Sequence, residues 1–276
     1  MIDPVLVTGG TGKTGRRVAA RLAAAGIDAR VGTRSPQEPQ HRRFDWGDLS
    51  CADAFNGCTA AWLVAPTDRA DHLAVMQPML EQAMARGVRR FVLLSSSLFG
   101  PQSPLMGEVH AWLAGHAEDW AILRPSWFMQ NFTEGAHGDT IRNEGAIYSA
   151  TGSGRVAFID ADDIAAAAVA ALTAGKAMNA DVILTGPKAL SYDNIAALVS
   201  ERAGRTIRHV AMEPEALSAR LNALGIPPEY VDALVQLDLV IRGGAEDRTT
   251  AGVMDMTGRP PRSFRAFVTA NKDMLG

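Results

Sequence analysis

Short apolar runs alternate with amphipathic segments over the first half of the chain. A run typical of a buried strand lies at residues 5–7, and further strands are expected at 29–32, 42–44, 60–64, 90–94 and 120–123. Apolar residues recur at helical spacing in residues 16–25 and 71–86, and a further helix is expected at 108–116. This alternation predicts an α/β fold in which a doubly wound parallel sheet is covered by helices on both faces.

The second half of the chain has a less regular pattern. Short strands are expected at 145–150, 156–159, 182–184 and 205–212. Helices are expected from a cap at Asp163 to 172, from a cap at Ser191 to 203, in two pieces after Pro214 that break at 225–228, and at 263–274. We interpret residues 1–132 as one domain. We expect residues 133–276 to form a smaller α/β lid that binds substrate, and some of its elements to return to the sheet of the first domain.

A glycine-rich turn, VLVTGGTGKTG at residues 5–15, lies between the first strand and the first helix. In a dinucleotide-binding turn Gly9 allows the sharp bend, Gly12 allows a pyrophosphate to approach, and Gly15 allows the helix to pack on the sheet. The N–H groups at the helix start then face the phosphates. We therefore predict a Rossmann-type NAD(P)-binding domain in which Thr11, Lys13 and Thr14 also contact the cofactor. An ordinary tight turn is the alternative, whereas a nucleoside-triphosphate loop is excluded because Val7 stands where that loop needs glycine.

The end of the second strand carries Arg34, where NAD-dependent proteins carry a carboxylate for the ribose hydroxyls. The planar guanidinium suits a 2′-phosphate, because it makes paired, charge-assisted hydrogen bonds. We therefore predict NADP(H) as cofactor, the alternative being a solvated surface arginine.

Ligands of such sheets bind at the carboxyl ends of the strands. Asp45 and Trp46 follow the third strand and could flank the adenine ring, or could form a turn with a packed tryptophan. Ala65 and Pro66 follow the fourth strand and Ser95 follows the fifth, so that all three are expected beside the cofactor.

Composition narrows the function classes. The formal net charge of -3 argues against broad nucleic-acid binding, and no apolar run is long enough to span a membrane. Cys51 and Cys58 fit neither a redox pair nor a zinc site, and the histidines form no metal-binding pattern. We expect a cytoplasmic protein without a signal peptide or a metal, a monomer or homodimer that acts on a small molecule.

Several segments together resemble the NmrA-like branch of the atypical short-chain dehydrogenases. They are TGGTGKTG at 8–15, Arg34, FDWGD at 44–48, LLSSS at 93–97, LRPSWFMQNF at 123–132, FIDADDIA at 158–165 and TGRPPRSFRAF at 257–267. The WFMQNF and TGRPPRSF segments are similar to those of ergot-alkaloid-type reductases, which reduce iminium centres with NADPH. The resemblance covers nearly the whole chain and implies NADP binding and a cleft between domains. It leaves function open, because the branch also contains quinone reductases and non-catalytic NADP sensors.

The chain departs from orthodox short-chain dehydrogenases in lacking their Tyr-x-x-x-Lys proton donor. The residues four positions after its three tyrosines are Gly152, Ala196 and Leu234. The lysine acid of some NmrA-like reductases also has no match in 105–115, which offers His110 instead. His110 could act as an acid and Ser96 could orient a substrate oxygen. The alternatives are a packed or surface histidine and a simple turn-forming serine.

An apolar triplet, Trp127, Phe128 and Met129, follows the sixth strand and would wall a pocket for a flat substrate. Phe99 is a further candidate, and interdomain core is the alternative for the triplet. Two hypotheses result: an NADPH-dependent reductase of a flat electrophile such as an iminium, quinone or conjugated carbonyl compound, or a non-catalytic NADP(H)-sensing regulator.

Overall fold

The computed structural model describes residues 4–275, which divide into two compact units. The first unit comprises residues 4–125, Ala161–Leu184 and Gly252–Arg259. The second comprises Ser126–Asp160, Thr185–Ala251 and residues 260–275. Each unit is therefore assembled from three separate segments of chain.

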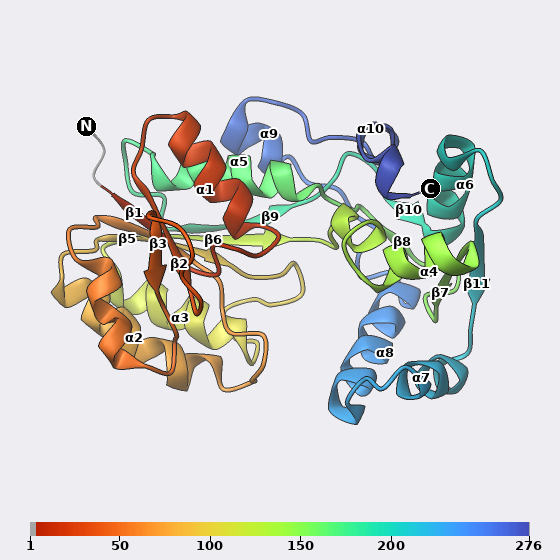
Figure 1. The fold of residues 1–276 in the computed structure, drawn as a ribbon, viewed down its shortest axis with the longest axis horizontal. Coiled ribbons are helices and arrows are strands. Elements are labelled where there is room, and N and C mark those ends of the chain that lie inside the picture. Colours follow the sequence, from red (N-terminus) through yellow and green to blue (C-terminus); the bar gives the residue numbers. More distant parts are fainter. Residues whose placement is uncertain (1–3, 276) are drawn as a thin grey trace. The chain divides into compact units, whose positions relative to one another are not determined.

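A seven-stranded parallel sheet forms the centre of the first unit (Figure 1), in the order β3-β2-β1-β4-β5-β6-β9. Its strands are β1 (Val5–Val7), β2 (Ala29–Thr33), β3 (His41–Arg43), β4 (Ala60–Leu63), β5 (Arg90–Leu94), β6 (Asp119–Pro125) and β9 (Ala180–Leu184). Strand β1 pairs with β2 on one side and with β4 on the other, so the strand order reverses there. The central strands are fully buried, as expected of a parallel sheet with helices on both faces.

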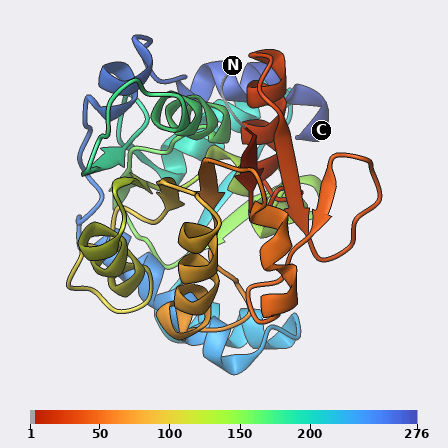
Figure 2. The ribbon, with the colours of Figure 1, turned by 90° about the vertical axis from the view of Figure 1, so that its left-hand side faces the viewer.

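Helices cover both faces of this sheet. On one face lie α1 (Gly15–Ala24), α5 (Ala161–Leu172) and α9 (Gly252–Thr257), with α5 in contact with both of the others. On the other face α2 (His72–Ala85) and α3 (Met106–His116) lie side by side (Figure 2). A 3₁₀ segment, Leu49–Phe55, packs against α2. The structure thus confirms the predicted Rossmann-type α/β fold.

The second unit combines two small sheets with short helices. Strand β7 (Ala146–Ser149) pairs in parallel with β11 (Arg208–Ala211), and β8 (Arg155–Val156) pairs antiparallel with β10 (Leu190–Ser191). The helices are α4 (Ala136–Glu144), α6 (Tyr192–Ala203), α7 (Pro214–Ala223), α8 (Pro228–Arg242) and α10 (Phe264–Ala270), with 3₁₀ turns at Met129–Phe132 and Lys272–Met274. Its main core is built on Phe132, Phe158, Tyr192 and Phe264. The predicted Ser191 cap is confirmed, because Ser191 and Asn194 form a reciprocal capping box.

Some predicted boundaries were wrong. Strand β6 continues through Arg124 and Pro125, because β9 pairs with it as far as Leu184. Helix α5 begins at Ala161, so Asp163 lies in its first turn rather than at its cap. The strand predicted at 156–159 is only Arg155–Val156, and the last helix is interrupted after Ala270. The sequence pattern did not predict α4 and α9, which are short.

Within residues 4–275, none of the helices combines the length and the apolar character needed to span a membrane.

Candidate functional site

The glycine turn between β1 and α1 has the geometry expected of a phosphate-binding turn. Gly9 has a φ of +57°, a left-handed conformation that favours glycine, and its carbonyl accepts a 2.9 Å hydrogen bond from the Gly12 N–H. A Cβ added at Gly15 would lie 2.2 Å from the Gly9 oxygen, whereas one added at Gly12 would meet only that oxygen, at 3.2 Å. Gly15 is therefore needed for packing of the turn against the helix. Gly12 faces space that a ligand can occupy.

A cavity of about 670 Å³ opens over this turn, within the first unit. Eight residues predicted to contact the cofactor line it: Gly9, Thr11, Gly12, Arg34, Asp45, Trp46, Ala65 and Pro66. The cavity lies at the carboxyl ends of β1, β2 and β4, where the strand order reverses, which is the usual ligand position in doubly wound sheets. The predicted residues Lys13, Thr14, Gly15 and Ser95 are not among its lining residues.

The cavity also has lining residues that sequence reasoning missed, among them Thr33, Ser35, Gln37, His41, Asp68 and Arg69. Thr33 and Ser35 flank Arg34, so their position at the carboxyl end of β2 could have identified them. Asp68 and Arg69 lie in the loop after β4, and only the strand order, in which β1 separates β2 from β4, brings that loop and the end of β2 to the same cavity.

Arg34 lies at the end of β2 with its guanidinium largely in solvent, where a 2′-phosphate could reach it. Its Nη1 is 3.2 Å from Oδ2 of Asp68, and the two side chains are 73% and 63% exposed. An ion pair this exposed contributes little to stability, so a phosphate can displace it at small cost.

Asp45 and Trp46 form a turn in which the tryptophan is packed. The Trp46 indole is buried against the Phe44 ring, 4.9 Å away edge to face, and its Nε1 donates a 2.8 Å hydrogen bond to the Val64 carbonyl. Asp45 Oδ1 accepts a 2.9 Å bond from the Gly47 N–H. The packed-turn interpretation therefore describes the geometry, and the contact of either residue with adenine stays a prediction.

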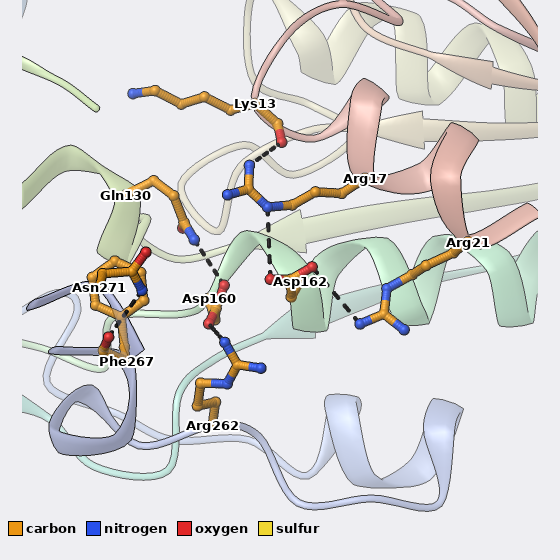
Figure 3. Close-up of polar contacts among 9 residues, drawn as sticks. All are labelled: Lys13, Arg17, Arg21, Gln130, Asp160, Asp162, Arg262, Phe267 and Asn271. Carbon is orange, nitrogen blue, oxygen red and sulfur yellow. Dashed lines mark hydrogen bonds and ion pairs between the residues drawn. The ribbon is translucent and has the colours of Figure 1, made fainter. Parts of the chain in front are cut away.

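Helix α1 is held to α5 through its arginines (Figure 3). Arg17 donates a 2.6 Å hydrogen bond to the Lys13 carbonyl and lies 3.7 Å from Asp162 of α5, and Arg21 lies 3.8 Å from the same carboxylate. Thr14, at the helix start, is buried and makes no side-chain capping bond. These contacts hold α1 against α5, and Thr11 and Gly12, shortly before the start of α1, line the cavity.

The serine segment after β5 is held by the neighbouring strand. The N–H groups of Ser95 and Ser97 donate to the carbonyls of Leu123 and Pro125, at 2.8 and 2.9 Å. Ser96 Oγ accepts a long bond, 3.3 Å, from the Leu98 N–H. Among the residues that the structure describes, the buried Ser95 Oγ has no hydrogen-bond partner. Because buried hydroxyls are normally satisfied, this unpaired hydroxyl is unusual, and contact of Ser95 with the cofactor stays a prediction.

His110, on helix α3, is packed against one face of the sheet and does not lie at the carboxyl ends of the strands. It is only 3% exposed, and its ring lies 5.6 Å from that of Trp120, the second residue of β6. Burial lowers the pKa of His110, partly opposed by the nearby Asp181 carboxylate. No described residue bonds to its Nδ1. This geometry favours the packed interpretation, and a catalytic role for His110 stays a prediction. Phe99 is partly exposed and packs against the hydrophobic core of the first unit.

The apolar triplet lies in the second unit. Met129 is 1% exposed and belongs to the core of that unit, so packing accounts for it. Phe128 forms a parallel bridge with Ile159, and Trp127 is partly buried against the same core. Trp127 and Phe128 therefore remain the candidates for substrate contact.

Three segments that carry the family resemblance meet at one buried carboxylate, also in the second unit. Asp160 is fully buried, and its two oxygens accept hydrogen bonds from Gln130 Nε2 at 2.7 Å and from Arg262 Nη1 at 2.8 Å (Figure 3). A charge so placed must be paired, which explains why Arg262 accompanies Asp160. Across residues 4–275, no group of three or more histidine, cysteine or acidic side chains is arranged to hold a metal ion.

Comparisons with known proteins agree with this geometry. A family model described as NAD(P)H-binding matches residues 9–175, and one described as the NmrA-like family matches residues 119–249. An agroclavine dehydrogenase of Claviceps fusiformis is 39% identical over 98% of both chains. The uncharacterized oxidoreductase YesF of Bacillus subtilis is 37% identical over 98% of this chain and 95% of its own.

Solved structures share the fold. The NADPH-dependent quinone oxidoreductase QOR2 of Escherichia coli, solved with NADPH, superposes with a TM-score of 0.84 over 98% of this chain and 99% of its own, at 21% identity. The match to the NAD(P)H-binding family model confirms the predicted dinucleotide cofactor. The glycine turn between β1 and α1 leaves space for the pyrophosphate of that cofactor. The chain belongs to the NmrA-like family of NAD(P)H-binding proteins and is an NAD(P)H-dependent oxidoreductase.

Proposed function

We propose that the protein is an NADPH-dependent reductase of a flat electrophile that is already activated, such as an iminium ion, a quinone or a conjugated carbonyl compound. The observation that carries this proposal is the absence of the Tyr-x-x-x-Lys proton donor from the sequence. Hydride transfer to a plain ketone builds charge on oxygen and needs a nearby acid or oxyanion donor. Transfer to an iminium ion only neutralises a positive charge, and a quinone spreads the new charge over its ring.

The environments of the ionisable side chains support this choice. A catalytic tyrosine needs a lowered pKa, yet the hydrogen bond to Glu144 raises the pKa of Tyr148 and burial raises that of Tyr192. Burial lowers the pKa of His110, which disfavours the imidazolium form that would donate a proton. The serine hydroxyls after β5 can orient a substrate atom through hydrogen bonds but are weak acids.

Two further features support the cofactor and substrate class. Arg34 lines the cavity over the glycine turn and follows β2, where NAD-dependent proteins carry a carboxylate, and this supports NADPH as the cofactor. The agroclavine dehydrogenase aligns with nearly the whole chain, and the WFMQNF and TGRPPRSF segments resemble iminium reductases. When bound, NADPH would supply the hydride. The protein's residues hold and orient the cofactor and the electrophile.

The test is a comparison of three substrates with the purified protein and NADPH: a cyclic iminium salt, a quinone and an isolated ketone. We expect reduction of the first two and little reduction of the ketone. Fast ketone reduction would contradict the proposal, because it would require a proton donor. Tight NADPH binding without turnover of any electrophile in a wider panel would favour the sensing regulator.

Trp127 provides a second arm of the test. If its indole contacts the substrate, Trp127→Ala should raise KM for the accepted electrophile and leave NADPH affinity unchanged. Met129→Leu, a core change of similar volume, is the matched control and should leave KM unaffected.

A further inference from the structure

Both arginines that line the cofactor cavity are paired with carboxylates. Arg34 Nη1 lies 3.2 Å from Asp68 Oδ2, and Arg69 makes two 2.6 Å hydrogen bonds to the two oxygens of Asp71. The hydrogen bond to Asp71 and the charges of Asp71, Asp68 and Asp45 hold the pKa of Arg69 above its usual value.

The two pairs differ in how they would respond to a phosphate. The Arg69–Asp71 pair is bidentate, so that its fork is already filled. The Arg34–Asp68 pair has one contact at a longer distance, and it joins the loop after β4 to the end of β2 across the cavity. Arg34 is therefore the more available of the two arginines for a phosphate, and Asp68 is the group that the phosphate would displace.

We propose that Asp68 sets the discrimination between NADPH and NADH by competing with the 2′-phosphate for Arg34. This inference rests on the proposed preference for NADPH. A 2′-phosphate bound to Arg34 would replace the carboxylate and remain close to it. It would thus lose part of its binding energy to repulsion between like charges. NADH carries no such phosphate, so the Arg34–Asp68 pair can stay intact when NADH binds.

This arrangement limits the affinity for NADPH without removing the preference for it. An exposed ion pair exchanges partners readily, and its contribution to the binding free energy depends on the ionic strength. Asp68 is therefore a specificity-determining residue that makes the oxidised and reduced phosphorylated cofactors easier to release.

The experiment measures the Kd of NADPH and NADH by calorimetric titration of the native protein and of Asp68→Asn, at low and at high salt. We expect NADPH to bind roughly two- to fivefold more tightly to the variant at low salt, the range of an exposed ion pair. High salt should reduce the gain, and the Kd of NADH should not fall. Asp53→Asn is the matched control, because Asp53 pairs with Arg86 outside the cavity, and it should change neither Kd.

A double-mutant cycle with Arg34→Ala shows whether Asp68 acts through Arg34. In the Arg34→Ala background, the effect of Asp68→Asn on NADPH should fall to the residual direct repulsion. Weaker NADPH binding by Asp68→Asn would overturn the inference, because Asp68 would then be holding Arg34 in place. If native protein binds the two cofactors equally and Arg34→Ala has no effect, the NADPH preference itself fails. If Arg34→Ala weakens NADPH but Asp68→Asn changes nothing, only the present inference fails.

Discussion

Arg124 on β6 forms an ion pair with Asp181 on the neighbouring strand β9. The same guanidinium donates a 3.2 Å hydrogen bond to the Ser97 carbonyl, and a longer one, 3.5 Å, to the Ser96 carbonyl. One side chain thus connects the last strand of the sheet to the serine segment that follows β5. The conformation of that segment depends on a strand that lies more than fifty residues later in the chain.

We expect Arg124→Ala to lower the free energy of unfolding by about 1–3 kcal/mol, because it leaves Asp181 and two carbonyls without their donor. It should also lower kcat by loosening the serine segment. The matched control is Arg90→Ala, which breaks the Arg90–Asp119 pair. This pair joins the amino ends of β5 and β6, whereas the serine segment follows the carboxyl end of β5. Urea unfolding should show similar losses for both variants. An equal loss of kcat in Arg90→Ala would contradict a specific role for Arg124.

Substitutions at Gly12 and Gly15 of the turn should separate cofactor binding from folding. Gly12→Val should abolish cofactor binding while the protein stays folded, since the added side chain occupies the pyrophosphate space. Gly15→Ala should instead destabilise the protein, because its Cβ would clash with the Gly9 carbonyl. Circular dichroism and cofactor titration measure the two properties. Tight NADPH binding by Gly12→Val would show that the pyrophosphate lies elsewhere.

Arg34→Ala should weaken NADPH by about 1.5–3 kcal/mol, the cost of losing a charge-assisted bidentate contact, and should weaken NADH much less. Arg43→Ala is the control, because Arg43 is a similarly exposed arginine that pairs with Asp48 outside the cavity. Calorimetric titration of each variant with both cofactors gives the comparison. Equal affinity of the native protein for NADPH and NADH would refute the prediction.

His110→Ala distinguishes a proton donor from a packed ring. A donor would make the variant about ten- to a hundredfold slower on a quinone and little changed on an iminium ion. The buried contact with Trp120 leads us to expect a loss of stability and unchanged rates on both substrates. His116→Ala, on the exposed side of α3, is the control for helix effects. A slower quinone reaction with native stability would establish the catalytic role.

Asp238 on α8 should make stability depend on pH. Burial raises its pKa to about 6, although its carboxylate accepts a 2.7 Å hydrogen bond from the Ala150 N–H. Because the folded pKa lies above the unfolded value, the charged form is penalised in the folded protein, and Asp238 costs stability as the pH rises from about 4 to above 6. Asp238→Asn should therefore stabilise the protein by about 1–2 kcal/mol at pH 8 and by little at pH 4.

Urea unfolding at several pH values measures this effect, with Asp232→Asn on the exposed side of the same helix as control. Equal effects of Asp238→Asn at pH 4 and pH 8 would exclude titration as the cause.

His137 makes stability depend on pH in the opposite sense. Burial lowers its pKa to about 4, so its contribution to stability is present above pH 6.5 and is lost as the pH falls toward 4.

Local sequence patterns predicted the fold of the first unit because most of its strands contain apolar runs, β3 being the polar exception, and its helices are amphipathic. They predicted less of the second unit, whose strands have two or four residues and depend on distant partners. Arg124 and Pro125 read as the end of a strand, since proline lacks a donor, but β9 extends the pairing through both.

The candidate site follows the same division. Gly9, Gly12 and Arg34 could be predicted because a strand, a turn and a helix adjoin in sequence. Asp68 could not be predicted, because its contact with Arg34 depends on the strand order, in which β4 and β2 pair with opposite sides of β1. The packing of His110 against Trp120 likewise depends on how α3 crosses β6, which no periodicity reveals.

Strand β9, one of the two edge strands of the sheet, has a consequence for protein synthesis. A nascent chain that has emerged only to residue 125 already contains the glycine turn and the walls of the cofactor cavity, yet β6 is still an open edge. Open edges pair with other chains, so this intermediate is exposed to aggregation until residues 180–184 leave the ribosome. Early cofactor binding on the ribosome would stabilise the turn but not close that edge.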